Sequence, residues 1–265
     1  MSANKPASMS TPISGIGAII IGDEITRGKR EDKHFPQLIS ILSQRGLVLD
    51  WAVHIGDDRQ RLTEILRSSF ATNDLVFSFG GIGNTPDDHT RQAAAAAAGV
   101  DLALHEVAVE TIRARCIEMN YPPSAHTLEM ANFPVGCDII PNPYNRIAGF
   151  SWQRHYFVPG FPQMAWPMIE WVLDTHYAHL FNQTVTSEAA LLVWKGIESA
   201  VIPMMRQLEI DYPQIKTFSL PFLGSDTVMR HIELGVRGAP DVVPVAMEVL
   251  RRGVVELGFA FDEKV

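Results

Sequence analysis

Glycines, a proline and two carboxylates stand together at one place in the chain, directly after an apolar run over residues 74–79. The residues follow in the order Gly80, Gly81, Ile82, Gly83, Asn84, Thr85, Pro86, Asp87, Asp88. Glycines allow positive φ and let a ligand approach the backbone without a Cβ in the way. The Thr-Pro-Asp-Asp run predicts a helix start with Thr85 as its cap. Backbone N–H groups at such a place bind anions, but an ordinary helix start has the same residues, so both interpretations stay open.

Common phosphate-binding motifs do not describe this stretch, because the third glycine of G-x-G-x-x-G is missing and no Gly-Lys-Ser/Thr follows. Asp87 and Asp88 would repel a bound phosphate unless a divalent cation such as Mg²⁺ lay between them. Three further carboxylates, Asp23, Glu24 and Asp57, also follow apolar runs. They would converge if those runs were parallel strands. The alternative is that these carboxylates are only solvated.

Hydrophobic patterning predicts the elements that would position these residues. Strands are expected over 16–21, 47–55, 74–79, 138–140, 148–152 and 155–158. Helices are expected over 35–42, 62–70, 86–98 and 104–116, and from about 164 to 177. The alternation of strand and helix predicts a parallel sheet with right-handed crossovers, and therefore an α/β fold.

The polar segment 182–187 is the expected boundary between two domains, 12–182 and 187–265. In the second, strands are expected over 191–194, 215–221 and 229–236, with helices over 197–208 and about 240–257. This pattern predicts a small α+β domain.

Composition excludes several classes of protein. The 265 residues are 46% hydrophobic and 20% charged, which is typical of a globular protein. The net charge of −8 argues against a general binder of nucleic acids or anionic membranes. No apolar run reaches the roughly 20 residues of a membrane helix, and residues 1–11 lack the apolar core of a signal peptide. With only two cysteines as well, we expect a cytoplasmic protein.

With these residues in place, the chain resembles the MoaB/Mog family of molybdopterin-binding domains, specifically the N-terminal part of the CinA family. The stretches that carry the resemblance cover about residues 15–180 and are Gly22-Asp23-Glu24-Ile25, Gly56-Asp57, the run from Gly80 to Thr90, Pro141-Asn142-Pro143 and Pro159-Gly160-Phe161-Pro162. The tail resembles, in order of elements only, the KH-like domain that follows in that family. It lacks the G-x-x-G loop of an RNA-binding KH domain, so a structural or dimerising role is expected.

The resemblance implies a three-layer α/β domain whose strand-end loops bind molybdopterin or an adenylated form of it. The residues expected to bind the ligand are Gly80, Gly81, Gly83, Asn84, Thr85, Asp23, Glu24 and Asp57. Asp87 and Asp88 are the expected catalytic residues and the expected ligands of Mg²⁺ or another divalent metal.

Three functions remain open at this stage. The first is binding of a pterin or nucleotide. The second, implied by the CinA branch, is hydrolysis of the pyrophosphate of ADP-ribose-type or FAD-type nucleotides with a divalent metal and K⁺. The third is a non-catalytic assembly module, and a homo-oligomer (dimer or trimer) is expected. The chain departs from the family at two positions. Gln163 follows the Pro-Gly-x-Pro loop, where the family commonly has a glutamate, and the segment after Pro143 has Ala148-Gly149 in place of the family's Ala-Pro-Gly. Both departures argue more against hydrolysis than against binding.

Overall fold

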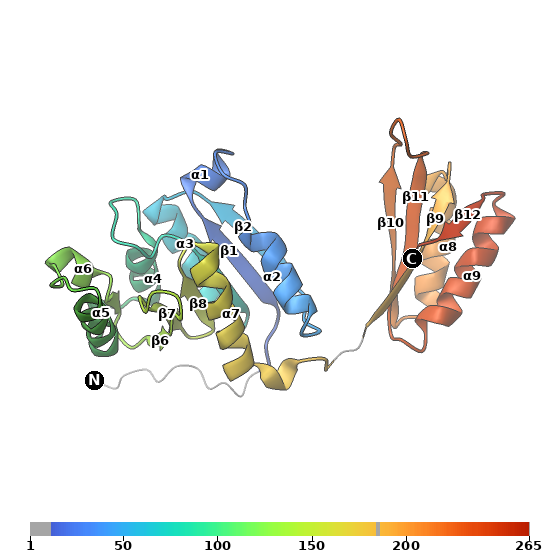
Figure 1. The fold of residues 1–265 in the computed structure, drawn as a ribbon. Helices are drawn as coiled ribbons and strands as arrows, with labels where there is room; N and C mark the ends of the chain where they lie inside the picture. The colour runs from blue at the N-terminus through green and yellow to red at the C-terminus, as the bar shows by residue number, and fades with distance from the viewer. Residues whose placement is uncertain (1–11, 184–185, 265) are drawn as a thin grey trace. The chain divides into compact units, whose positions relative to one another are not determined.

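The chain forms two compact units, divided between Asn182 and Gln183 (Figure 1). The computed structural model describes residues 12–183 and 186–264. The division falls at the edge of the polar segment in which the sequence predicts a boundary. Each unit has hydrophobic clusters of its own, so each is described by itself.

The first unit is built on a six-stranded sheet in the order β2-β1-β3-β8-β7-β6. Strands β2, β1, β3 and β8 are parallel neighbours, whereas β7 is antiparallel to both β8 and β6. The six strands are β1 (Ile16–Ile21), β2 (Trp51–Ile55), β3 (Leu75–Phe79), β6 (Asp138–Ile140), β7 (Gly149–Trp152) and β8 (His155–Val158). The predicted α/β class with a mostly parallel sheet is therefore confirmed.

Helices cover both faces of this sheet and make three layers (Figure 1). Successive strand residues point to opposite faces, so Ile20 packs with α2 and α7 while Ile19 packs with α3, α4 and α5. The helices of the unit are α1 (Asp23–Thr26), α2 (His34–Ser43), α3 (Arg59–Phe70), α4 (Thr90–Ala98), α5 (Glu106–Glu118), α6 (Ala125–Glu129) and α7 (Pro162–His176), with a 3₁₀ turn at Ala178–Leu180. The alanines of α4 let it lie close to the sheet, since Ala93 and Ala94 are fully buried.

Several predicted boundaries are wrong for identifiable reasons. Strand β2 begins at Trp51 and not at residue 47, because the side chain of Asp50 accepts a hydrogen bond from the N–H of Ile16 at 2.7 Å in place of a backbone carbonyl. Patterning also missed α6 and the two-stranded ribbon of β4 (Leu102–Leu104) and β5 (Asn132–Pro134). These elements are too short to show a period.

The second unit is an antiparallel sheet with two helices on one face. Its elements are β9 (Ser187–Trp194), α8 (Glu198–Asp211), β10 (Ile215–Phe222), β11 (His231–Gly238), α9 (Val243–Glu256) and β12 (Phe261–Glu263). The strand order is β10-β11-β9-β12, and every neighbouring pair is antiparallel. The α+β character is confirmed, and the β-α-β-β-α-β order refines the KH-like description to the split β-α-β arrangement of ferredoxin-like folds.

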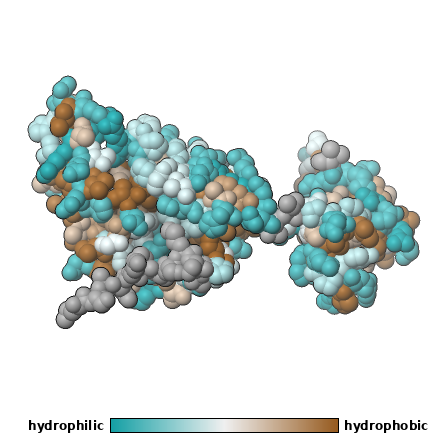
Figure 2. Space-filling view, turned by 90° about the horizontal axis from the view of Figure 1, so that it is seen from below, coloured by the Kyte–Doolittle hydropathy of each residue, from teal (hydrophilic) through white to brown (hydrophobic). Residues whose placement is uncertain are grey.

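Within residues 12–183 and 186–264, the helices are too short or too polar to cross a membrane. On the face drawn in Figure 2, hydrophilic residues cover most of each unit, and apolar patches lie between them.

A buried polar pair lies at the start of β8, at the end of the sheet opposite the strand-end loops. The hydroxyl of Ser69 and Nε2 of His155 are hydrogen-bonded, and the ring of Phe70 packs edge-on against the imidazole with centroids 4.6 Å apart. Burial lowers the pKa of His155 to about 3. The imidazole is therefore neutral in the folded protein.

This histidine makes stability depend on pH. An unfolded histidine takes up a proton near pH 6.5, so between about pH 6.5 and 3 the unfolded state binds the extra proton and the free energy of unfolding falls as pH falls. The contribution of His155 to this decrease in the free energy of unfolding approaches about 1.4 kcal/mol per pH unit. Urea unfolding at pH 7, 6 and 5 should show a smaller decrease for His155→Phe than for the wild type. His126→Phe, on an exposed side chain, should keep the wild-type decrease; equal pH dependence in all three proteins would contradict this account.

Candidate functional site

The loops that follow the parallel strands meet where the strand order reverses. Strand β1 lies between β2 and β3, so the chain crosses from β1 to one side and then to the other. Ligands of open α/β sheets bind at the carboxyl ends of the strands at such a switch point. The loops there follow β1, β2, β3 and β8, and they contain most of the residues expected from the sequence.

Gly80 joins three of these strand ends. Its N–H donates to the carbonyl of Val158 at 3.0 Å, and its own carbonyl accepts a hydrogen bond from Oγ1 of Thr90 at 3.0 Å. Its φ is 96°, and a Cβ at this position would lie 2.6 Å from the carbonyl oxygen of Ile21. Only glycine fits between β1 and β3 in this conformation.

Helix α4 begins at Thr90, so the prediction that Thr85 caps it is wrong, as is the placement of Asp87 and Asp88 in its first turn. The N–H of Thr90 donates to the carbonyl of Gly81 at 2.9 Å, which together with the Oγ1 contact fixes the helix start there. Residues 85–88 form a separate turn instead. The N–H of Asp88 donates to the carbonyl of Thr85 at 3.0 Å, and the carboxylate of Asp88 accepts from the N–H and hydroxyl of Thr85 at 2.9 and 2.5 Å.

The loop between β3 and this turn offers free donors. Among the described residues, the N–H groups of Gly81, Ile82 and Gly83 have no hydrogen-bond acceptor. Successive unpaired N–H groups in a glycine loop form a concave anion site. The predicted role of Gly81 and Gly83 is therefore compatible with the geometry, although the donors belong to the loop and not to a helix terminus.

Two further strand-end loops, after β1 and β2, are joined by hydrogen bonds between backbone N–H groups and carboxylates. The N–H of Asp23 donates to Oδ2 of Asp57 at 2.9 Å, and the N–H of Asp57 donates to Oδ1 of Asp23 at 3.3 Å. A Cβ on Gly56 would lie 2.3 Å from Oδ1 of Asp23, so this approach also requires glycine. Burial raises the pKa of Asp57, and although the N–H of Asp23 opposes that rise, the negative charges of Asp23, Glu24 and Asp87 add to it.

The structure thus brings Asp23, Glu24, Asp57 and Asp87 into one acidic region, whereas Asn84 and Asp88 are directed elsewhere. Nδ2 of Asn84 donates to the carbonyl of His126 at 2.9 Å, and the carboxylate of Asp88 is bound to Thr85. Across the part of the chain that the structure describes, groups of three or more His, Cys, Asp or Glu side chains placed to hold a metal ion are absent. A metal at Asp87 and Asp88 therefore remains a prediction that requires oxygen atoms from a ligand.

Arg91 is a buried residue of the site that the sequence reasoning missed. Its guanidinium donates to the carbonyls of Gly83, Glu129 and Asn132, so it fastens the glycine loop to α6 and β5. Burial lowers the pKa of Arg91, and the charges of Asp88 and Glu129 oppose that shift. A lone arginine in an alanine-rich helix was the available signal, because a charged side chain there needs a specific partner.

His34, at the start of α2, was also missed. Its Nε2 lies 3.0 Å from the carbonyl of Gly160, and its ring stacks on Phe79 with centroids 4.6 Å apart. A Cβ on Gly160 would come within 3.4 Å of the Cα of Gly80. His34 therefore holds the loop after β8 against the glycine loop after β3. Sequence distance hid this contact, since 126 residues separate His34 from Gly160.

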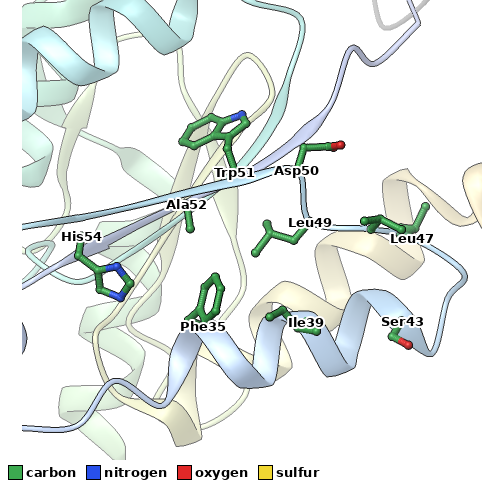
Figure 3. A pocket seen from close by; sticks show the side chains of 10 residues that line it. Phe35, Ile39, Ser43, Leu47, Leu49, Asp50, Trp51, Ala52 and His54 are labelled. Atoms are coloured by element: carbon green, nitrogen blue, oxygen red, sulfur yellow. The ribbon is translucent and has the colours of Figure 1, made fainter. Parts of the chain in front are cut away.

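A groove of about 540 Å³ lies away from these loops, between α2 and the edge strand β2 (Figure 3). Phe35, Ile39 and Leu49 point toward one another across it. Two of its polar side chains are already bound, Asp50 to the N–H of Ile16 and His54 to Asp32 at 2.8 Å, and Ser43 is a further polar side chain of the lining. The lining of this groove is mostly apolar, so the strand-end loops, with three successive free N–H groups, are the better candidate site for a phosphate.

Comparison with known proteins finds relatives that match mainly the first unit. The family model described as a probable molybdopterin binding domain matches residues 17–179. A CinA-like protein of Anaeromyxobacter dehalogenans is 33% identical over 164 residues, which are 60% of this chain and 40% of the relative. A putative competence-damage inducible protein of Clostridium botulinum is 28% identical over 194 residues, 72% of this chain and 47% of the relative. This chain thus spans less than half the length of these relatives.

Two further known proteins are matched over most of their own length. A protein of Pyrobaculum arsenaticum is 26% identical over 207 residues, 77% of this chain and 78% of that protein. The crystal structure of CinA from Thermoplasma acidophilum, a protein described as having unknown function, superposes with a TM-score of 0.55 at 24% identity. It covers 62% of this chain and 98% of its own, and it supports the fold of the first unit.

Replacing Arg91 should loosen the glycine loop. Arg91→Met leaves the carbonyls of Gly83, Glu129 and Asn132 without their donor, and we expect the free energy of unfolding to fall by about 2–4 kcal/mol. Urea unfolding measures this loss. Arg59→Met, at an exposed position on α3, should change stability by less than about 0.5 kcal/mol. Equal, small effects of the two substitutions would show that the buried guanidinium does not hold the loop.

Proposed function

Because the chain belongs to the family of probable molybdopterin-binding domains, we propose that it binds molybdopterin or an adenylated form of it at the strand-end loops. The observation that supports this proposal most directly is the row of free N–H groups at Gly81, Ile82 and Gly83. They lie at the switch point of the sheet, where α/β folds bind ligands, and they match the needs of a phosphate group.

The neighbouring carboxylates suit the rest of such a ligand. Pterin N–H groups and sugar hydroxyls are hydrogen-bond donors, and carboxylate oxygens accept from them. Asp57 is held by the N–H of Asp23 at 2.9 Å, so its position is fixed before a ligand arrives. Asp87 is exposed beside it and adds negative charge. In this proposal Asp88 shapes the loop through Thr85 and does not itself touch the ligand.

Isothermal titration with molybdopterin and with adenine nucleotides, with and without Mg²⁺, tests this function. A Cβ on Gly83 would lie 2.4 Å from Oδ2 of Asp88, so Gly83→Ala should disturb the turn and weaken binding at least about tenfold. Gly258→Ala is the control, because it lies in the other unit and its added Cβ would have nothing within 4 Å. It should bind as the wild type does. Absence of heat for every ligand under all conditions would reject the proposal.

Hydrolysis of a pyrophosphate nucleotide is a second candidate, favoured by the acidic region around Asp57. Its raised pKa reflects burial and then the repulsion of Asp23, Glu24 and Asp87, and a divalent cation would relieve that repulsion. Carboxylate oxygens are ligands that Mg²⁺ accepts together with substrate phosphates. When bound, the metal would polarise a phosphoryl oxygen and activate water, and K⁺ is a further expectation from the CinA branch. The chain's part would be to hold the phosphates at Gly81 to Gly83 and to provide a carboxylate as base.

The activity test is a panel of ADP-ribose and FAD with Mg²⁺, Mn²⁺ or Co²⁺, with and without K⁺, followed by product chromatography. Asp87→Ala should abolish turnover by removing a carboxylate from the acidic region. Asp88→Ala should also abolish it, because the Thr85 turn loses its acceptor. Asp101→Ala, on an exposed loop residue, is the control and should leave turnover unchanged. Turnover that survives both site substitutions and EDTA would exclude this mechanism.

A protein with neither heat of binding nor turnover would fit the third function, a non-catalytic assembly module. We also propose a cytoplasmic location, which the two free, buried cysteines Cys116 and Cys137 support, since reducing compartments keep thiols unpaired. Assembly as a homo-oligomer, a dimer or a trimer, is part of the same proposal.

A further inference from the structure

The loop after β1 carries a dense group of basic side chains. Four of the chain's 22 Lys and Arg residues fall within positions 27–33, and they are Arg27, Lys29, Arg30 and Lys33. The loops after β2, β3 and β8, which span residues 56–58, 80–89 and 159–161, contain no Lys or Arg. The basic residues of the strand-end loops therefore lie in one segment, residues 27–33, which we call the basic strap.

The strap is held at the candidate site on both sides. It follows α1, which lies directly beyond the end of β1 (Figure 1). On that side the guanidinium of Arg27 pairs with the carboxylate of Asp23 at 2.5 Å, and Asp23 exchanges hydrogen bonds with Asp57. On the other side comes His34, which contacts the carbonyl of Gly160 in the loop that lies against the glycine loop. The strap therefore runs from the acidic region to the glycine loop.

Hydrogen bonds also fix the middle of the strap. The N–H of Arg30 donates to the carbonyl of Glu24 at 2.9 Å, so the backbone folds back onto α1. Two residues later, the carboxylate of Asp32 accepts from the N–H of His34 at 2.7 Å and contacts Nε2 of His54 at 2.8 Å. The backbone of the strap is thus positioned before a ligand arrives, and binding would have to order only the long side chains.

Three cations of the strap have no partner. Arg27 is in an ion pair, and the buried Arg91 donates to three carbonyls. Within residues 12–183 and 186–264, by contrast, the side chains of Lys29, Arg30 and Lys33 make no hydrogen bond or ion pair, and all three are exposed. They remain available to an anion that binds at the strand ends.

The charge of the site indicates which anion needs them. The three free N–H groups of Gly81 to Gly83 are enough for one phosphate. A second, linked phosphate would add negative charge near Asp57, where the carboxylates already repel one another and raise the pKa of that residue. Cations that reach the second phosphate offset this repulsion. Guanidinium and ammonium groups bind phosphate oxygens through charge-assisted hydrogen bonds.

We propose that the basic strap binds a second phosphate, so that the site selects ligands with two linked phosphates over ligands with one. This inference rests on the proposed ligand-binding function and narrows it. Adenylation of a phosphate ester creates a pyrophosphate, so the strap favours the adenylated pterin over the pterin with a single phosphate. Lys29 and Arg30 are specificity-determining residues in this account.

Isothermal titration of the full chain with ADP and with AMP, without Mg²⁺ and at one ionic strength, tests the inference. The wild type should bind ADP at least about tenfold more tightly than AMP. Lys29→Gln combined with Arg30→Gln should weaken ADP binding at least about tenfold and change AMP binding less than about twofold, because only the second phosphate reaches the strap. Circular dichroism verifies that the variant is folded.

A matched control removes the same charge elsewhere. Arg67→Gln combined with Arg113→Gln changes two exposed arginines on α3 and α5, outside the strand-end loops. This variant should bind ADP and AMP as the wild type does. An equal loss of ADP binding in the control and strap variants would mean that net charge alone matters, and it would overturn the inference.

Other outcomes separate this inference from the binding function itself. Equal affinity of the wild type for ADP and AMP would overturn the role of the strap and leave the binding function in place. A parallel loss of ADP and AMP binding in the strap variant would also overturn it, because long-range attraction does not distinguish one phosphate from two. If neither nucleotide gives heat with the wild type, the inference fails, and titration with molybdopterin still decides the binding function.

Discussion

The close approach of Gly80 to the carbonyl of Ile21 is the contact on which the candidate site depends. It brings the end of β3 against the end of β1, and the N–H and carbonyl of the same residue bind β8 and the start of α4. Four elements therefore converge on one residue without a side chain. Any larger residue would separate β1 from β3 and open the switch point. The free N–H groups of the following residues owe their position to this packing.

Charge is arranged around that point at a cost to the folded state. The pKa of Asp57 is raised because its carboxyl group is partly buried and lies near other carboxylates. The ionised form of Asp57 therefore lowers the stability of the folded, unliganded protein. Arg91 is buried among carbonyl groups, and burial lowers its pKa. Shifted pKa values of this kind cluster at functional sites. The free donors and the carboxylates of the acidic region belong to loops that follow neighbouring strands, which suits a ligand that carries both a phosphate and hydrogen-bond donors.

The two units differ in how many faces of their sheet are covered by helices. In the first, helices cover both faces, so the strands are apolar throughout and only the loops at their ends are available for chemistry. In the second, helices cover one face, and the other keeps exposed leucine and aromatic side chains. The first arrangement favours a small-molecule site at the strand ends, and the second favours contact with another protein surface.

The sequence by itself determined the parallel α/β unit, the α+β tail and the strand ends that carry glycines and carboxylates. Those features are local, since apolar runs, glycine turns and helical spacing act within a few residues. Tertiary structure decided that α4 starts at Thr90, because the carbonyls of Gly80 and Gly81 bind that residue and not Thr85. It also decided the roles of Arg91 and His34, whose partners lie up to 126 residues away. Such contacts follow from how strands are ordered in the sheet, which no local pattern encodes.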